Sequence, residues 1–123
     1  MIPVVTPERM RAIDQHFIQV QGIPGLALME NAARGLLCVV QQARGAHPGP
    51  VLVLCGPGNN GGDGLALLRL LHGAGIPARG LLFHDPAQLP PDAAVNHRRA
   101  VEAGCALELI LDAAQLNAVF WQT

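Results

Sequence analysis

Lysine and tyrosine are both absent from this sequence of 123 residues, and all eight of its basic residues are arginines. Without lysine, the chain contains neither a P-loop lysine nor a lysine for Schiff-base or general-base catalysis. Without tyrosine, it has no phenolic acid or base. Charged residues make up only 14% of the chain, and the formal net charge is −1. This balance argues against a surface that binds nucleic acid or an anionic membrane, because such surfaces are basic.

Cysteine is also scarce: Cys38, Cys55 and Cys105 are far apart, with no CxxC pattern and no cluster with histidine. We therefore expect neither a zinc site nor a disulfide framework, and we interpret the three thiols as small buried side chains in a reducing compartment. Apolar runs long enough to cross a bilayer are absent, and Glu8 and Arg11 interrupt the segment where a signal peptide needs an apolar stretch. The sequence predicts a soluble, cytoplasmic protein.

Helical and strand patterns alternate along a chain that is half hydrophobic and long enough for one domain, residues 1–123. The predicted helices cover residues 6–20, 26–44, 62–72, 91–103 and a segment from 112 onward, and the predicted strands cover 51–55, 78–83 and 107–111. Strands separated by helices predict right-handed crossovers and a mostly parallel sheet with helices on both faces. The expected fold is α/β, a three-layer α/β/α Rossmann-like fold. Three strands are few for it, so we expect it to be incomplete at the C-terminus.

Two of these elements carry expectations about burial. Residues 51–55 form an unbroken apolar run, which is typical of a central parallel strand covered on both faces. Residues 26–44 are apolar nearly all round the helix, which predicts burial on more than one side, against the sheet or a partner subunit. A homodimer is one arrangement that satisfies this pattern.

The segment that most suggests chemistry is the glycine-rich stretch at residues 56–64, with the sequence GPGNNGGDG. It follows the predicted strand 51–55 and leads into a helix, and ligands of open α/β sheets bind outside the carboxyl ends of the strands. Its five glycines let the backbone approach a ligand closely, and free amides at the start of a helix favour anionic oxygens. The stretch therefore predicts a site for an anionic, nucleotide-type ligand.

Side chains within this stretch narrow the choice of ligand. Asn59 and Asn60 offer amide oxygens and N–H donors, which suit an alkali cation or the hydroxyl and amide groups of a nucleotide better than a transition metal. Asp63 has two interpretations: it caps the helix or interacts with its dipole, or it contacts the ligand. Both interpretations stay open on the sequence alone.

The spacing Gly56-x-Gly58-x-x-Gly61 also fits the dinucleotide fingerprint, which makes an NAD-dependent Rossmann oxidoreductase an alternative. Two features count against it. Asp63 would repel a pyrophosphate held by the same amides. The acidic residue that binds the ribose would have to be Asp85, which directly precedes a proline.

Three segments together make the chain resemble a known family. The glycine-rich stretch, residues 28–33 (LMENAA) and residues 6–14 are similar to motifs of the YjeF N-terminal domain family, the NAD(P)H-hydrate epimerases, and the similarity spans residues 4–118. The resemblance implies interconversion of the R and S epimers of hydrated NADH and NADPH, damaged cofactors with water added at C6 of the nicotinamide ring. It also implies a partner, an ADP- or ATP-dependent dehydratase, fused or separate, that acts on the S form.

The same resemblance implies roles for individual residues. Those that match the family's contacts to the hydrated dinucleotide are Asn59, Asn60, Gly61, Gly62 and Asp63. Asn60 also matches a ligand of a potassium ion, the implied cofactor. Glu30 and Asn31, in the LMENAA motif, either border the pocket or lie on the helix surface.

The family's remaining functional segments have no counterpart in residues 1–123. In the family, later segments carry the second potassium ligand, a phosphate-contacting loop and the aspartate assigned to acid–base work. We therefore expect the chain to be the N-terminal part of such a domain, with the catalytic aspartate beyond Thr123, and we assign no catalytic residue. A non-catalytic nucleotide-binding or interaction module of the same fold is a further alternative.

Overall fold

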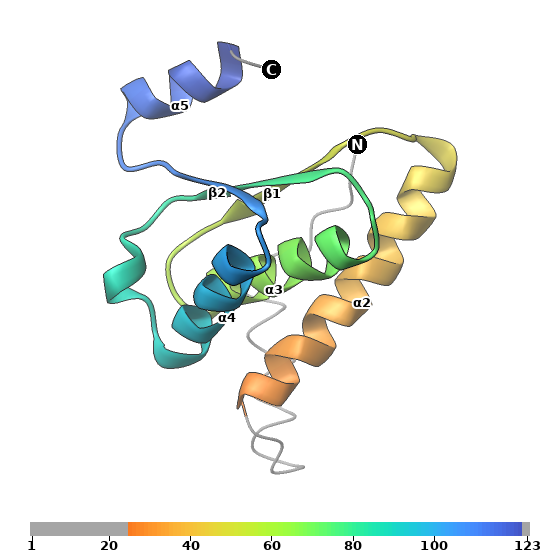
Figure 1. Ribbon diagram of the computed structural model, residues 1–123, viewed down its shortest axis with the longest axis horizontal. Coiled ribbons are helices and arrows are strands. Elements are labelled where there is room, and N and C mark those ends of the chain that lie inside the picture. The colour runs from red at the N-terminus through yellow and green to blue at the C-terminus, as the bar shows by residue number, and fades with distance from the viewer. Residues whose placement is uncertain (1–24, 122–123) are drawn as a thin grey trace.

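The computed structural model describes residues 25–121, which form a three-stranded parallel sheet and its connecting helices (Figure 1). The strands are β1 (Val51–Cys55), β2 (Ala78–Leu82) and β3 (Ala106–Leu109), in the order β1-β2-β3. The helices are α2 (Gly25–Ala46), α3 (Asn59–Gly73), α4 (Pro91–Glu102), α5 (Ala113–Trp121) and the short 3₁₀ helix η1 (Pro86–Gln88). Because the strands are parallel, their carboxyl ends lie at one edge of the sheet.

The elements predicted for this range are present, which confirms the α/β class with a parallel sheet. The predicted helix 6–20 lies outside the described residues. The largest difference concerns α3, which begins at Asn59 rather than at Gly62. Gly58 has a φ of 83°, a conformation that side chains rarely allow, and turns the chain directly into the helix. The glycine-rich stretch is therefore three residues of loop, 56–58, followed by helix.

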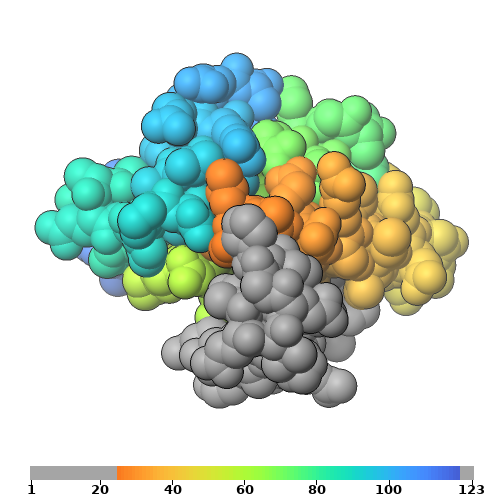
Figure 2. Space-filling model, turned by 90° about the horizontal axis from the view of Figure 1, so that it is seen from below, coloured from red at the N-terminus to blue at the C-terminus, as the bar shows by residue number. Residues whose placement is uncertain are grey.

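Two layers of helices lie on opposite sides of the sheet, with α2, α3 and α4 on one side and α5 on the other (Figure 1). The helix α3 is central to the larger layer, because it contacts β1, β2, α2 and α4. The main core lies between α3 and the sheet, and it includes the fully buried side chains of Leu65, Leu68, Leu71 and Leu82. Seen from the helical side, α4 lies beside the N-terminal end of α2 (Figure 2).

The smaller layer covers only part of the sheet, so the expectation that β1 is buried on both faces is wrong. Its first, third and fifth residues are buried beneath α3, whereas Leu52 and Leu54 are 42% and 62% exposed. The helix α5 instead packs near the carboxyl ends of β2 and β3, where Val119 contacts Leu81 of β2 and Ile110, which follows β3. The face of β1 that points away from α3 is therefore uncovered in the described part of the chain.

The helix α2 is buried along one face, which differs from the expected burial on several sides. Its buried residues are Leu28, Met29, Ala33 and Val40, and the helix packs against α3 and α4. All three thiols are free, but only Cys55 is buried: Cys38 is exposed on the outer side of α2 and Cys105 is partly buried, so the interpretation of all three as buried is wrong for Cys38 and holds only in part for Cys105. No helix within residues 25–121 has both the length and the apolar character needed to cross a bilayer.

Two glycines bring the start of α3 close to the end of β1. A Cβ atom at Gly61 would overlap the backbone carbonyl oxygen of Gly56. A Cβ atom at Gly64 would lie 2.9 Å from Cys55 Sγ, closer than van der Waals contact allows. Both positions therefore need glycine for packing, whatever ligand the loop binds.

Gly62 has the same role toward the other two helices. A Cβ atom at this position would lie 2.6 Å from Met29 Sδ on α2 and 2.9 Å from the Ala93 Cα atom on α4. The methionine side chain can move, but the backbone of α4 cannot move without disturbing the rest of the helix. Gly62 therefore sets how closely α3 and α4 approach each other.

We expect Gly62→Ala to destabilise the fold, although alanine is the better helix former. Overpacking costs about 1–3 kcal/mol, whereas helix propensity returns about 1 kcal/mol, so the net loss should be up to about 2 kcal/mol. Urea unfolding followed by circular dichroism measures it. Gly35 in α2 is the matched control, because a Cβ atom there meets nothing within 4 Å. Gly35→Ala should raise stability by up to about 1 kcal/mol, and equal effects of the two changes would contradict the packing described.

Cys55 should resist alkylation until the protein unfolds. Burial raises the pKa of the Cys55 thiol to about 12, so at about pH 8 only about one molecule in 10⁴ carries the reactive thiolate. Cys38 is exposed and should react first. Mass spectrometry after iodoacetamide treatment, with and without urea, gives the order of reaction. Native-state alkylation of Cys55 as fast as that of Cys38 would show that the β1–α3 contact opens readily.

Candidate functional site

The candidate site is the junction of β1 and α3, made of the loop 56–58 and the first turn of the helix. Gly58 is the N-cap residue, and no capping side-chain hydrogen bond to α3 is found in residues 25–121. Within this part of the chain, the N–H groups of the first turn lack a capping side chain, an arrangement that suits an anionic oxygen. A Cβ atom at Gly56 or Gly58 would meet no described atom within 4 Å, so the loop borders open space.

Asn59 and Asn60, expected in a loop, occupy the first turn of α3. Asn59 is exposed at the loop. Asn60 is partly buried, and its Oδ1 atom is buried with no hydrogen-bond donor among the described residues. Leaving a buried carbonyl oxygen without a donor costs about 1–3 kcal/mol. The position therefore favours a ligand group or a cation that satisfies this oxygen.

Gly61, Gly62 and Asp63 are buried, in contrast to the two asparagines. The two glycines are packed against the loop and against α2 and α4. Asp63 is only 3% exposed and is the fifth residue of α3, beyond its first turn. The interpretation of Asp63 as the helix cap is therefore wrong. Of the five residues expected to contact a ligand, Asn59 and Asn60 are accessible at the start of α3, whereas Gly61, Gly62 and Asp63 are buried.

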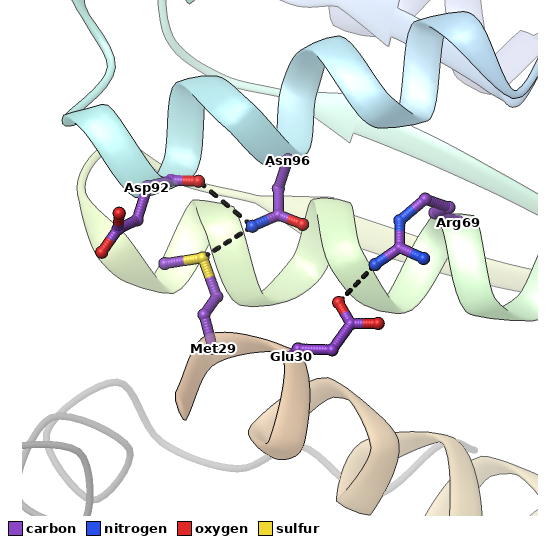
Figure 3. Close-up of polar contacts among 5 residues, drawn as sticks. All are labelled: Met29, Glu30, Arg69, Asp92 and Asn96. Carbon is purple, nitrogen blue, oxygen red and sulfur yellow. Dashed lines mark hydrogen bonds and ion pairs between the residues drawn. The ribbon is translucent and has the colours of Figure 1, made fainter. Parts of the chain in front are cut away.

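A small polar cluster lies between α2 and α4, next to Gly62 (Figure 3). Asn96 of α4 is fully buried, and its Nδ2 atom donates hydrogen bonds to Met29 Sδ and to the Asp92 carbonyl oxygen, both at 3.1 Å. Met29 is also the side chain that packs against Gly62. The cluster therefore joins α2, α3 and α4. The sequence alone does not single out Asn96, and the available signal is one asparagine on a helix face whose other buried residues are alanines.

Glu30 and Asn31, for which the resemblance leaves two interpretations, lie on α2. Glu30 forms an ion pair with Arg69 of α3, and both side chains are partly buried (Figure 3). A pair at this depth contributes about 1 kcal/mol or less, so its main effect is to align the two helices. Asn31 is exposed.

The acidic residue that a dinucleotide fingerprint would need has a local role instead. Asp85 Oδ1 accepts a hydrogen bond from the Ala87 N–H at 3.0 Å and caps η1, where the sequence predicts only a loop. A hollow of about 330 Å³ opens nearby at the carboxyl ends of β2 and β3. At its rim, Asp112 Oδ1 accepts a hydrogen bond from the Gln115 N–H at 2.8 Å. Both carboxylates therefore stabilise helix starts.

Clusters of histidine, cysteine, aspartate or glutamate that could hold a metal ion are absent from residues 25–121. A cation at the β1–α3 junction would instead be held by amide and carbonyl oxygens. These are ligands that hard cations prefer, and the buried Oδ1 of Asn60 is of this type.

Comparisons with known proteins identify the family that the chain resembles. A profile of the family described as YjeF-related protein N-terminus matches residues 25–118. An NAD(P)H-hydrate epimerase of Rhodopirellula baltica is 37% identical over 114 residues, which cover 93% of this chain and 46% of that protein. A bifunctional NAD(P)H-hydrate repair enzyme Nnr of Salinibacter ruber is 43% identical over 95 residues, which cover 76% of this chain and 18% of that protein.

A third relative, an NAD(P)H-hydrate epimerase of Limosilactobacillus reuteri, is 47% identical over 83 residues, which cover 68% of this chain and 39% of that protein. The chain therefore spans less than half the length of each of these relatives. The match to the family profile, however, covers most of the chain and includes the whole β1–α3 junction. The chain belongs to the YjeF-related protein N-terminus family.

Proposed function

We propose that this chain supplies the substrate-binding half of an enzyme that interconverts the R and S epimers of hydrated NADH and NADPH. The observation that carries the proposal is the β1–α3 junction, where uncapped helix amides and the buried oxygen of Asn60 meet at an open glycine loop. Family membership and the similarity over 114 residues to an NAD(P)H-hydrate epimerase support it.

In this proposal, the accessible residues of the glycine-rich stretch contact the ligand, and its buried residues hold them in position. The first-turn amides of α3 bind an anionic oxygen of the dinucleotide, and Asn59 and Asn60 bind its hydroxyl and amide groups. Gly61, Gly62 and Asp63 are buried, so they act by fixing the position of the helix start. A fixed helix start holds the bound substrate in one orientation, and an oriented substrate loses less entropy on reaching the transition state.

A potassium ion is part of the proposal, with Asn60 as its ligand in this chain. The fit rests on the Oδ1 atom, a hard oxygen that is buried and receives no hydrogen bond from the described residues. When bound, the ion would supply a positive charge that helps to hold the substrate. Any further ligands would be oxygens from outside the described residues or from the substrate.

The chemistry also requires an exposed proton-transferring group, which residues 25–121 do not present at the loop. Epimerisation at a carbon that carries a hydroxyl and is bonded to a ring nitrogen needs loss and return of the hydroxyl, or opening and closing of the ring. Either route needs a group that accepts and returns a proton. Asp63, the one carboxylate in the glycine-rich stretch, is only 3% exposed, so we propose that this group lies outside residues 1–123. A dehydratase that acts on the S form is the proposed partner.

The activity test compares two proteins: residues 1–123, and a fusion of these residues to the part of the Rhodopirellula relative that the similarity does not cover. Chromatographic separation of the epimers follows conversion of S-hydrated NADH to the R form. We expect turnover by the fusion alone, because only the fusion has both halves of the site. Binding without turnover by both proteins would favour a non-catalytic nucleotide-binding module. Absence of both binding and turnover would contradict the proposal.

Changing Asn60 tests the potassium ligand in the same fusion. Loss of an oxygen that contacts a charge costs about 1.5–3 kcal/mol, so Asn60→Ala should raise the potassium concentration for half-maximal activity by about 10- to 100-fold. Asn60→Asp keeps an oxygen at this position and should retain the potassium response. Asn117→Ala, an exposed asparagine on α5, is the matched control. An unchanged potassium response in Asn60→Ala would remove Asn60 from the ion site.

A further inference from the structure

Asn96 of α4 occupies a position that stability alone does not explain. Its side chain is fully buried, and its Oδ1 atom receives no hydrogen bond within residues 25–121. A buried oxygen without a donor destabilises a fold, and alanine, the residue at the other two buried positions of α4, would avoid this cost. The contacts that distinguish asparagine from alanine at this position are those of the amide nitrogen.

The amide nitrogen holds a flexible side chain in place. Asn96 Nδ2 donates hydrogen bonds to Met29 Sδ and to the Asp92 carbonyl oxygen, both at 3.1 Å (Figure 3). The bond to Asp92, one turn earlier on α4, fixes the amide group itself. Methionine has three rotatable side-chain bonds and adapts to irregular gaps in a core. The bond to sulfur therefore favours the one arrangement of Met29 in which it lies against Gly62 of α3.

Gly62 is enclosed by two helices that Asn96 joins. Met29 of α2 lies against Gly62, and so does Ala93 of α4, one turn before Asn96. Because Asn96 is on the same helix as Ala93 and bonds Met29, it links the two contacts. Gly62 is two residues after Asn60, within the same helix start. Backbone atoms within one helical turn are joined by hydrogen bonds, so a displacement of Gly62 also displaces Asn60.

We propose that Asn96 is a positioning residue for the potassium site at Asn60. Asn96 holds Met29 against Gly62, and this contact fixes the direction of Asn60 Oδ1, a buried oxygen with no hydrogen-bond donor among the described residues. This role rests on the proposed function, in which Asn60 is the potassium ligand. Groups that hold a metal ligand in place affect the affinity for the metal. Asn96 is fully buried, so it acts on the ion only through the start of α3.

The functional test measures the rate of epimerisation against potassium concentration in the fusion to the Rhodopirellula relative. Asn96→Ala should raise the concentration for half-maximal rate by about three- to tenfold, with a smaller effect on the maximal rate. Met29→Leu nearly keeps the volume but removes the sulfur that accepts the hydrogen bond, so it should have a similar effect. Because both changes break the same bond, the double variant should be no worse than either single variant. Additive effects of the two changes would contradict an action of Asn96 through Met29.

A control variant separates positioning from loss of stability. Val119→Ala also removes a buried side chain, but Val119 lies on α5, on the other side of the sheet (Figure 1). This change should lower the melting temperature of the fusion and leave its potassium response unchanged. An equal shift of the potassium response in Val119→Ala and Asn96→Ala would overturn the proposal, because both changes would then act through stability.

A measurement without substrate tests the same contacts in residues 1–123. In NMR spectra of protein with labelled methionine methyl groups, the Met29 resonance is assigned by its loss in Met29→Leu. Asn96→Ala should displace this resonance, and it should also displace the Gly62 amide and Asn60 side-chain amide resonances. Unchanged Gly62 and Asn60 resonances would overturn the proposal.

Failure of this proposal is distinguishable from failure of the proposed function. If the unaltered fusion shows no potassium response, the potassium site itself is contradicted, and the role of Asn96 with it. If the unaltered fusion responds to potassium and Asn96→Ala responds in the same way, only the role of Asn96 is overturned.

Discussion

The close approach of α3 to the end of β1 is the constraint on which the rest of the structure depends. Only three loop residues separate β1 from α3, so the start of the helix lies directly against the strand end, and glycine at positions 61 and 64 permits this contact. The same helix carries the leucines that fill the core and the glycine against which α2 and α4 pack. Consequently the position of the first turn, with Asn59 and Asn60, is fixed by the whole larger layer.

Much of this architecture follows from the sequence, because local patterns determine local structure. The apolar run of β1, the turn glycines and the helix starts at Pro91 and Asp112 all predict elements that the structure contains. The start of α3 does not follow, because it depends on the positive φ of Gly58, which residue type permits but does not require. The two-sided burial expected for β1 is wrong because α5 packs against Leu81 of β2 and Ile110 and not against β1, and an apolar run does not show which element covers it.

In the candidate site, too, the sequence predicts some features and leaves others undetermined. Glycine-rich stretches suggest close approach of a ligand, yet three of the five glycines here are needed for packing between protein segments, and only Gly56 and Gly58 border open space. The polar contacts of Asn96 and the ion pair of Glu30 depend on which helix faces meet, so a single sequence does not predict them. What the sequence does predict well is position: the polar residues at the junction lie at the carboxyl end of β1.

An edge strand made of valine, leucine and cysteine also bears on how this polypeptide behaves at high concentration. Unpaired strand edges without charge are templates for aggregation and fibril growth. Here the hazard is limited by Pro50 directly before β1 and Pro57 shortly after it, because proline cannot donate to a ladder and so prevents its extension at either end. The two prolines therefore restrict any pairing at this edge to the five residues of β1.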